Sequence, residues 1–211
     1  MRIHIMRRSL YPVIVGLLLI TGCRSNQKPS ETNLENAINR YLQSRGQTCT
    51  WLGQPFPINV TAAQQKLTFG IAPQMAVLEK AGLVQSLDTE TNLPGIFGGT
   101  TRQHVWRYEP TTDGKRYLRQ TQAALTQSAG FCYGTKTVDS IVKWTEPTSD
   151  QPASKTEVTY TYKLSDLAPW AERPDVQSQF GDIRTTVAGI SKVNQTITLQ
   201  LTNKGWEVPG H

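Results

Sequence analysis

Few side chains in this sequence stand at spacings that support catalysis or metal binding. Of the three histidines, His4 lies near the start of the chain, His104 falls in an expected strand and His211 is the last residue. No set of His, Cys, Asp and Glu has the spacing of a metal site, and no Gly-x-Ser-x-Gly sequence marks a serine nucleophile. The glycine-rich stretch 95–99 lacks the Lys-Ser/Thr pair of a phosphate-binding loop. The sequence therefore predicts no catalytic residue, no metal and no cofactor.

The three cysteines are the remaining candidates for chemistry, and the residues before Cys23 predict the fate of the first. Arginines near the start are followed by an apolar run, Val13–Ile20, and then by Thr21 and Gly22. This order of cationic, apolar and small residues is typical of a secretory signal that is removed from the mature chain. The apolar stretch 10–22 is too short to span a bilayer, which takes about twenty residues.

Residues 20–23 (Ile-Thr-Gly-Cys) resemble the lipobox of bacterial lipoproteins. The resemblance implies removal of the signal peptide 1–22 and attachment of lipid, palmitate included, to Cys23. Two or more acyl chains anchor a protein stably to a membrane, whereas one holds it weakly. Arg24 replaces the Asp that retains such proteins in the inner membrane, which implies an outer-membrane anchor with the domain in the periplasm. A plain cleaved signal and an uncleaved anchor are the alternatives.

Cys49 and Cys132 form an even pair in a compartment that oxidises thiols, which predicts a disulfide between them. Gly130 and Gly134 flank Cys132 and let the backbone come close to a neighbour, as a bridge requires. Two separate buried thiols are the alternative. A reactive thiol would need a lowered pKa, and Lys136 is the one cation close to it in the sequence.

Charge and length limit the partners and the domain count. The net charge is +6, and the leader supplies half of it through its three arginines, so the mature chain carries +3. A chain this mildly basic, and exported, does not predict nucleic-acid binding. We expect a lipidated cysteine and polar tether at 23–31, followed by one periplasmic domain at 32–211.

Helical periodicity predicts three helices in the first half of the domain. Thr32 and Glu35 have the spacing of a capping box, at the start of a helix that ends before Gly46. Its apolar residues recur on one face: Leu34, Ala37, Ile38, Tyr41 and Leu42. A short helix is expected at 61–65, and a longer one at 74–81 with a glycine directly after it.

Two strands are expected next, at 103–109 and 116–119, joined through an Asp-Gly turn at 113–114. A polar, glycine-rich loop at 85–101 precedes them. With the helix before them, residues 73–119 resemble the end of a winged-helix domain, a helix followed by a two-stranded wing. That resemblance implies DNA binding in a cytoplasmic protein, which export removes. Packing against the rest of the chain, or recognition of protein or wall polymer by the wing, are the remaining interpretations.

Period-2 alternation predicts an antiparallel sheet with one wet face in the second half of the chain. Three strands are expected to turn these residues inward: Val138, Ser140, Val142 and Trp144; Val158, Tyr160, Tyr162 and Leu164; Ile197, Leu199 and Leu201. An insertion, 165–192, contains a short expected helix at 174–180, and a last strand is expected at 206–208. A helix followed by strands that wrap it resembles the cystatin-like folds, so we expect an α+β domain with the helix–hairpin unit inserted or appended.

Four side chains form the predicted binding surface, because flat aromatic rings stack on sugars and peptides: Trp106, Arg107, Tyr108 and Trp170. We expect a non-catalytic binding or assembly module of the cell envelope. An unknown protein or cell-wall partner would meet either the 93–119 or the 165–185 segment. An envelope hydrolase or a hydrolase inhibitor is the alternative. A hydrolase would place a serine or paired acids beside His104, and an inhibitor would show a protruding loop.

Replacement Cys23→Ser should leave the precursor uncleaved and free of palmitate, because serine offers no thiol for the thioether to lipid. Metabolic labelling with palmitate and the mobility of the precursor on gels check both effects. Normal processing and labelling of the variant would contradict the lipobox assignment.

Overall fold

The structure, a computed structural model, describes residues 27–94, 98–123, 126–148 and 154–210. The signal peptide and Cys23 lie outside the described residues. Helices and antiparallel strands both occur along the described chain, which confirms the α+β class. None of the described helices is long and apolar enough to cross a membrane.

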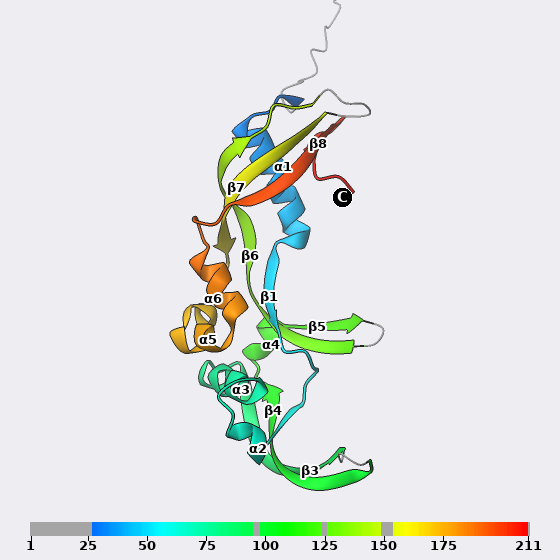
Figure 1. Cartoon of the computed structure of the whole chain (residues 1–211), viewed down its shortest axis with the longest axis vertical. Coiled ribbons are helices and arrows are strands. Elements are labelled where there is room, and N and C mark those ends of the chain that lie inside the picture. The colour runs from blue at the N-terminus through cyan, green and yellow to red at the C-terminus, as the bar shows by residue number, and fades with distance from the viewer. Residues whose placement is uncertain (1–26, 95–97, 124–125, 149–153, 211) are drawn as a thin grey trace, which may run out of the picture.

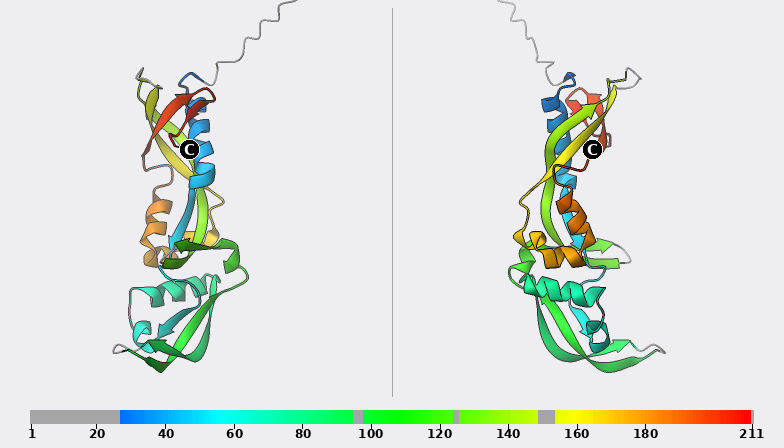
Figure 2. Two further views of the ribbon diagram at one scale, coloured as in Figure 1. Left: turned by 90° about the vertical axis from the view of Figure 1, so that its right-hand side faces the viewer. Right: turned by 60° about the vertical axis from the view of Figure 1, so that its left-hand side comes forward.

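The strands form two sheets, which lie toward opposite ends of an elongated molecule (Figures 1 and 2). The end that we call the proximal lobe holds α1 (Glu31–Arg45), β7 (Lys155–Ser165), β8 (Gln195–Thr202) and β9 (Gly205–Glu207). The opposite end, the distal lobe, holds β2 (Ile58–Thr61), α2 (Ala62–Gln65), α3 (Ile71–Lys80), β3 (Val84–Pro94) and β4 (Thr100–Pro110). The middle section holds β1 (Gln47–Trp51), α4 (Gly114–Tyr117) and β5 (Leu118–Ala123).

The strand β6 (Thr126–Trp144) is long enough to serve both ends of the molecule. Its 19 residues span about 60 Å at the usual rise of a strand. Its first half pairs with β5 and β1, and its second half pairs with β7, in every case antiparallel. The large sheet therefore runs β1-β6-β7-β8-β9, with β5 also paired to β6.

The helix α1 forms where the periodicity predicts it but begins at a different cap. Ser30 is the N-cap residue, and its hydroxyl accepts the backbone N–H of Asn33 at 3.3 Å. The predicted capping box of Thr32 and Glu35 is therefore wrong, since both residues lie inside the helix. Its end at Gly46 is confirmed. Four residues of the predicted apolar face are buried: Leu34, Ala37, Ile38 and Leu42.

Two bulges in β6 overturn the predicted facing of its residues. The register with β7 slips at Asp139 and again at Val142, and each slip leaves one residue unopposed. Each slip also turns the side chains that follow to the other face. Val138, Ile141 and Trp144 therefore pack toward the core, and Val142, which was predicted inside, is 50% exposed.

The alternation predicted for β7 and β8 is confirmed on the core side. Their inward residues meet α1 and β9 in a proximal core of ten buried side chains: Leu34, Ala37, Ile38, Leu42, Val138, Val158, Tyr160, Tyr162, Leu199 and Trp206. The other face of β7 is less wet than predicted, because Thr159 and Thr161 are buried as well. Thr161 donates to the carboxylate of Asp139 at 3.3 Å, which satisfies its hydroxyl.

In the distal lobe, both predicted helices are present, and α3 ends as its sequence predicts. The N–H of Leu83 donates to Leu78 O and the N–H of Gly82 donates to Glu79 O, both at 2.9 Å. This pair of bonds is the Schellman motif, which needs a positive φ at the residue after the cap. Gly82 supplies it, with φ of 76°.

The predicted hairpin is wrong in its pairing. Residues 85–94, predicted as loop, form most of β3, which pairs with β4 along its whole length. The Asp-Gly turn at 113–114 begins α4, and β5 joins the large sheet instead. Gly114 is needed there for close approach, because a side chain would collide with the backbone carbonyl of Leu83. The small sheet therefore has the order β2-β4-β3.

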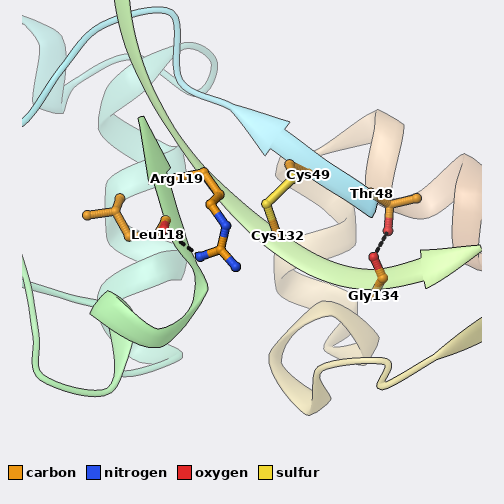
Figure 3. Close-up of a disulfide and its surroundings, with 6 residues drawn as sticks. All are labelled: Thr48, Cys49, Leu118, Arg119, Cys132 and Gly134. Atoms are coloured by element: carbon orange, nitrogen blue, oxygen red, sulfur yellow. Dashed lines mark hydrogen bonds between the residues drawn. A yellow bond between two sulfur atoms is a disulfide. The ribbon is translucent and has the colours of Figure 1, made fainter. Parts of the chain in front are cut away.

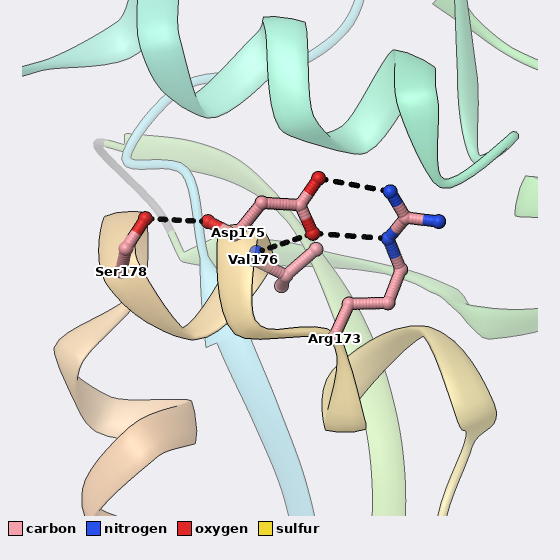
Figure 4. A network of polar contacts seen from close by, with 4 residues as sticks. All are labelled: Arg173, Asp175, Val176 and Ser178. Carbon is pink, nitrogen blue, oxygen red and sulfur yellow. Dashed lines mark hydrogen bonds and ion pairs between the residues drawn. The ribbon is translucent and has the colours of Figure 1, made fainter.

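The insertion forms three short helices: η2 (Pro169–Glu172), α5 (Pro174–Gln179) and α6 (Gly181–Ala188). The helix α5 was predicted and α6 was not. At the start of α5, the Arg173 guanidinium donates to both carboxylate oxygens of Asp175 at 3.1 and 2.8 Å (Figure 4). These hydrogen bonds lower the pKa of the Asp175 carboxyl. The same carboxylate accepts the N–H of Val176, so it helps to start the helix.

The insertion and the distal lobe share one core. Its buried side chains come from β2, α3 and β4, from β6, and from all three insertion helices. Val176 and Phe180 are among them, as are Met75 and Leu78 of α3. The 165–185 segment therefore holds the distal lobe to the middle section with its apolar face.

The predicted disulfide between Cys49 and Cys132 is present (Figure 3). The two residues are directly opposed on β1 and β6, in the middle section. Beside them, Thr48 donates its hydroxyl to Gly134 O at 2.9 Å. The glycine at position 130 is also required, because a Cβ there would lie 2.5 Å from Thr50 O.

We expect the double variant Cys49→Ala/Cys132→Ala to lose about 4–5 kcal/mol of unfolding free energy, the loop-entropy value for a separation of 83 residues. Denaturant titration of the oxidised protein and the variant measures the difference. The unmodified protein under reducing agent is the matched control, since it loses the bridge without a change of sequence. Two free thiols in the denatured, unreduced protein would show that the bridge does not form.

Candidate functional site

The four side chains predicted as a binding surface do not gather on one open face. Tyr108 and Trp170 are 3% and 5% exposed and belong to the distal core. Trp106 is half-buried and packs against the same core. Arg107 lies on the opposite face of β4, where its Nε pairs with the Glu109 carboxylate at 3.3 Å. Aromatic residues near loops were therefore a poor guide to the open surface.

Trp170 covers the core where the insertion meets the middle section. Its ring stands edge-on to those of Tyr117, Phe131 and Tyr133, with centroids 5.9, 6.3 and 6.1 Å away. Such contacts stabilise an aromatic cluster beyond the area that it buries. Its indole N–H has no hydrogen-bond partner among the described residues.

Three exposed apolar side chains lie in the distal lobe instead. Leu67 and Phe69 stand in the loop between α2 and α3 and are 45% and 71% exposed. Leu87 stands on β3 and is 64% exposed. The sequence carries a weak signal for the first two, because two apolar residues occur in a short stretch that neither helical nor strand periodicity explains. Phe69 and Leu87 are the most exposed of the large apolar side chains in the described part of the chain, ahead of Trp51, Val142 and Val193.

Beside Leu87 the surface of the small sheet is hollowed. A depression of about 280 Å³ is lined by Gln85, Ser86, Leu87, Arg107 and Glu109. It combines one apolar side chain with an ion pair and with short polar groups. This composition suits a single side chain of a protein partner, with the polar groups fixing its orientation.

Two side-chain pairs cross the β3–β4 hairpin farther along. His104 Nε2 lies 2.5 Å from Asp88 Oδ1, and Arg102 Nε lies 2.6 Å from Glu90 Oε2. All four side chains are well exposed, so each pair adds little to stability. Both contacts run diagonally across the two strands, since Glu90 lies opposite His104 and Asn92 lies opposite Arg102.

The His–Asp pair does not extend to a catalytic triad. Ser86, the nearest serine along β3, lies opposite Tyr108, four residues from His104 on β4, which is about 13 Å along a strand. Its hydroxyl donates to Glu79 Oε1 at 2.7 Å. The described residues also contain no cluster of three metal-ligating side chains.

No protein-family model, no curated protein and no solved structure matches this chain. Neither the lipobox nor the winged-helix and cystatin-like resemblances gain support from a relative.

Burial raises the pKa of the Tyr108 phenol above its usual value of 10.0. A hydrogen bond with Gln65 lowers the pKa, and the nearby Glu79 carboxylate raises it. A raised pKa in the folded state means that stability is complete below the unfolded value and is lost as pH rises through the folded value.

We therefore expect the unfolding free energy to fall as pH rises above 10.0, and to fall less steeply in the variant Tyr108→Phe. At neutral pH the variant should lose roughly 1 kcal/mol, the contribution of one hydrogen bond. Denaturant titrations at neutral and alkaline pH measure both effects. Parallel pH curves for the two proteins would contradict the assignment.

Proposed function

We propose that this chain is a lipid-anchored envelope lipoprotein that acts as a non-catalytic binding module. Cys23 carries the lipid at the outer membrane, the 23–31 tether links it to α1, and the distal lobe meets a protein partner in the periplasm. The lipobox resemblance supports the anchor, and the placement of the exposed apolar side chains supports the binding role.

The observation that carries the proposal is the arrangement of the two ends. The first described residues and α1 lie at the proximal end of the elongated molecule, and β3 and β4 lie at the other (Figures 1 and 2). Leu67, Phe69 and Leu87 belong to the far end. A module anchored through its proximal end would present these side chains away from the membrane.

Confinement to a membrane compensates for modest affinity. A partner in the same envelope layer experiences a raised effective concentration of the distal lobe, so a few contacts suffice. The continuous strand β6 and the shared distal core keep the lobe in a fixed place relative to α1. The tether alone then supplies freedom of orientation.

A hydrolase inhibitor is the second candidate, because the loop between α2 and α3 presents Phe69 at 71% exposure. An inhibitor of this kind would insert the loop into the cleft of an envelope hydrolase. The same experiment separates the two, since the captured partner would then be a hydrolase whose activity the purified protein lowers.

Site-specific photo-crosslinking in intact cells tests the proposal. A photoreactive residue at position 69 should give a discrete adduct, whereas the same residue at position 142 should give none. Val142 is the matched control because it is also apolar and 50% exposed but lies in the proximal lobe.

An adduct from position 142 alone, or from neither position, would overturn the binding role of the distal lobe. Recovery of the protein in the soluble fraction of the same cells would overturn the anchor. The two parts of the proposal therefore fail separately.

A further inference from the structure

The strand β3 is an open edge of the small sheet. In the order β2-β4-β3 it has a neighbour on one side, and over the part of the chain that the structure describes no strand pairs with its other side. Figure 2 shows the hairpin of β3 and β4 reaching away from the helices at the distal end. Eleven residues make this a long edge, and natural proteins usually protect such edges from pairing with other chains.

Hydrogen bonds and register show which backbone groups face outward. The N–H of Ser86 donates to Glu79 Oε1 at 2.9 Å and so does not bond to β4. The register with β4 continues without a bulge, and outward and inward residues alternate along an antiparallel strand. Asp88, Glu90 and Asn92 therefore direct their N–H and C=O groups outward. Pro94 is the next outward residue of this alternation. Its missing N–H therefore removes no hydrogen bond to β4.

These three residues are the unprotected part of the edge. The N–H of Ser86 is already bonded to the Glu79 carboxylate, and Pro94 has no N–H. Between them, no hydrogen bond joins the outward N–H and C=O groups of Asp88, Glu90 or Asn92 to another described residue. An incoming strand would find alternate donors and acceptors at the spacing that a sheet requires.

Charge argues against a second copy of this chain as the incoming strand. Pairing two copies antiparallel through the middle of β3 would oppose Asp88 or Glu90 to an acid of the other copy. Like charges directly opposite each other destabilise a sheet, and charged residues on an edge are a common defence against self-pairing. The edge is thus open to a strand whose residues beside the acids are cationic.

We propose that β3 takes an extended segment of another protein as a fourth strand of the small sheet, with Lys or Arg beside Asp88 and Glu90 and an apolar side chain beside Leu87. This inference rests on the proposed role of the distal lobe as the binding end. Backbone groups of residues 88–92 supply the pairing. The depression of about 280 Å³ beside Leu87 receives the apolar side chain.

The two faces of the sheet define the pattern of the segment. Asp88 and Glu90 lie on one face, and each has a carboxylate oxygen, Oδ2 and Oε1, without a partner among the described residues. Leu87 lies on the other face, because successive side chains of a strand alternate. A segment in which cationic and apolar residues alternate satisfies both faces at once.

The probe is a seven-residue peptide of alternating Lys and Val with blocked ends, titrated into the mature lipoprotein in detergent and followed by fluorescence anisotropy. The variant Glu90→Pro removes one outward N–H and leaves the β3–β4 bonds in place, so it should weaken binding by about tenfold relative to Glu90→Ala. Glu90→Ala is the matched control, because it loses the same charge and keeps the N–H. The peptide methylated on every backbone nitrogen should not bind, because neither of its edges can then donate to β3.

Amide hydrogen exchange on the unmodified protein makes the test independent of whether the proline variant folds. The amides of Asp88, Glu90 and Asn92 should exchange fast in the free protein and slow with the peptide bound. Those of Thr89 and Thr91, which bond to β4, should be slow throughout.

Equal affinities of the two Glu90 variants, or no change in exchange at residues 88–92, would overturn the proposal. So would a dimer in analytical ultracentrifugation that Glu90→Pro abolishes, since a second copy would then occupy the edge. Crosslinking at position 69 without peptide binding would remove the edge proposal and leave the binding role of the distal lobe in place.

Discussion

The pairing of β1 with β6, closed by the Cys49–Cys132 bridge, is the constraint on which the rest of the structure depends. β1 carries the chain from α1 in the proximal lobe toward the distal lobe, and β6 runs back the other way (Figure 1). Phe131 and Tyr133 of β6 lie in the distal core, and Val138 lies in the proximal core. One strand thus belongs to two cores, and the bridge fixes its partner at the point between them.

The two lobes differ in how they are packed and in which of their segments stay exposed. The proximal lobe is a helix on a curled sheet, and the two enclose a core of their own. The distal lobe is held through the insertion, whose apolar side chains pack against α3, and this leaves its hairpin and its α2–α3 loop open. A binding surface on such a lobe keeps its place relative to the proximal end, because core packing and a continuous strand link them.

Sequence reasoning succeeded where a local pattern is tied to a local interaction. The apolar face of α1, the glycine after α3 and the alternation in β7 are all of this kind. Sequence reasoning failed where the structure of a segment depends on which other segment of the chain pairs with it. Residues 84–94 are mostly polar and become a strand because β4 pairs with them. The facing of Val142 depends on bulges that no local pattern marks. The exposure of Phe69 depends on the packing of the whole lobe, so the local sequence carries only a weak signal for it.

The account holds that β6 and the disulfide join the two lobes into one body. Pulsed electron resonance between spin labels at Gln43 on α1 and Lys80 on α3 tests this most directly, since both side chains are exposed and belong to different lobes. The account predicts one narrow distribution of distances in the oxidised protein. A broad or double distribution would contradict it, because the distal lobe would then move freely with respect to the proximal lobe.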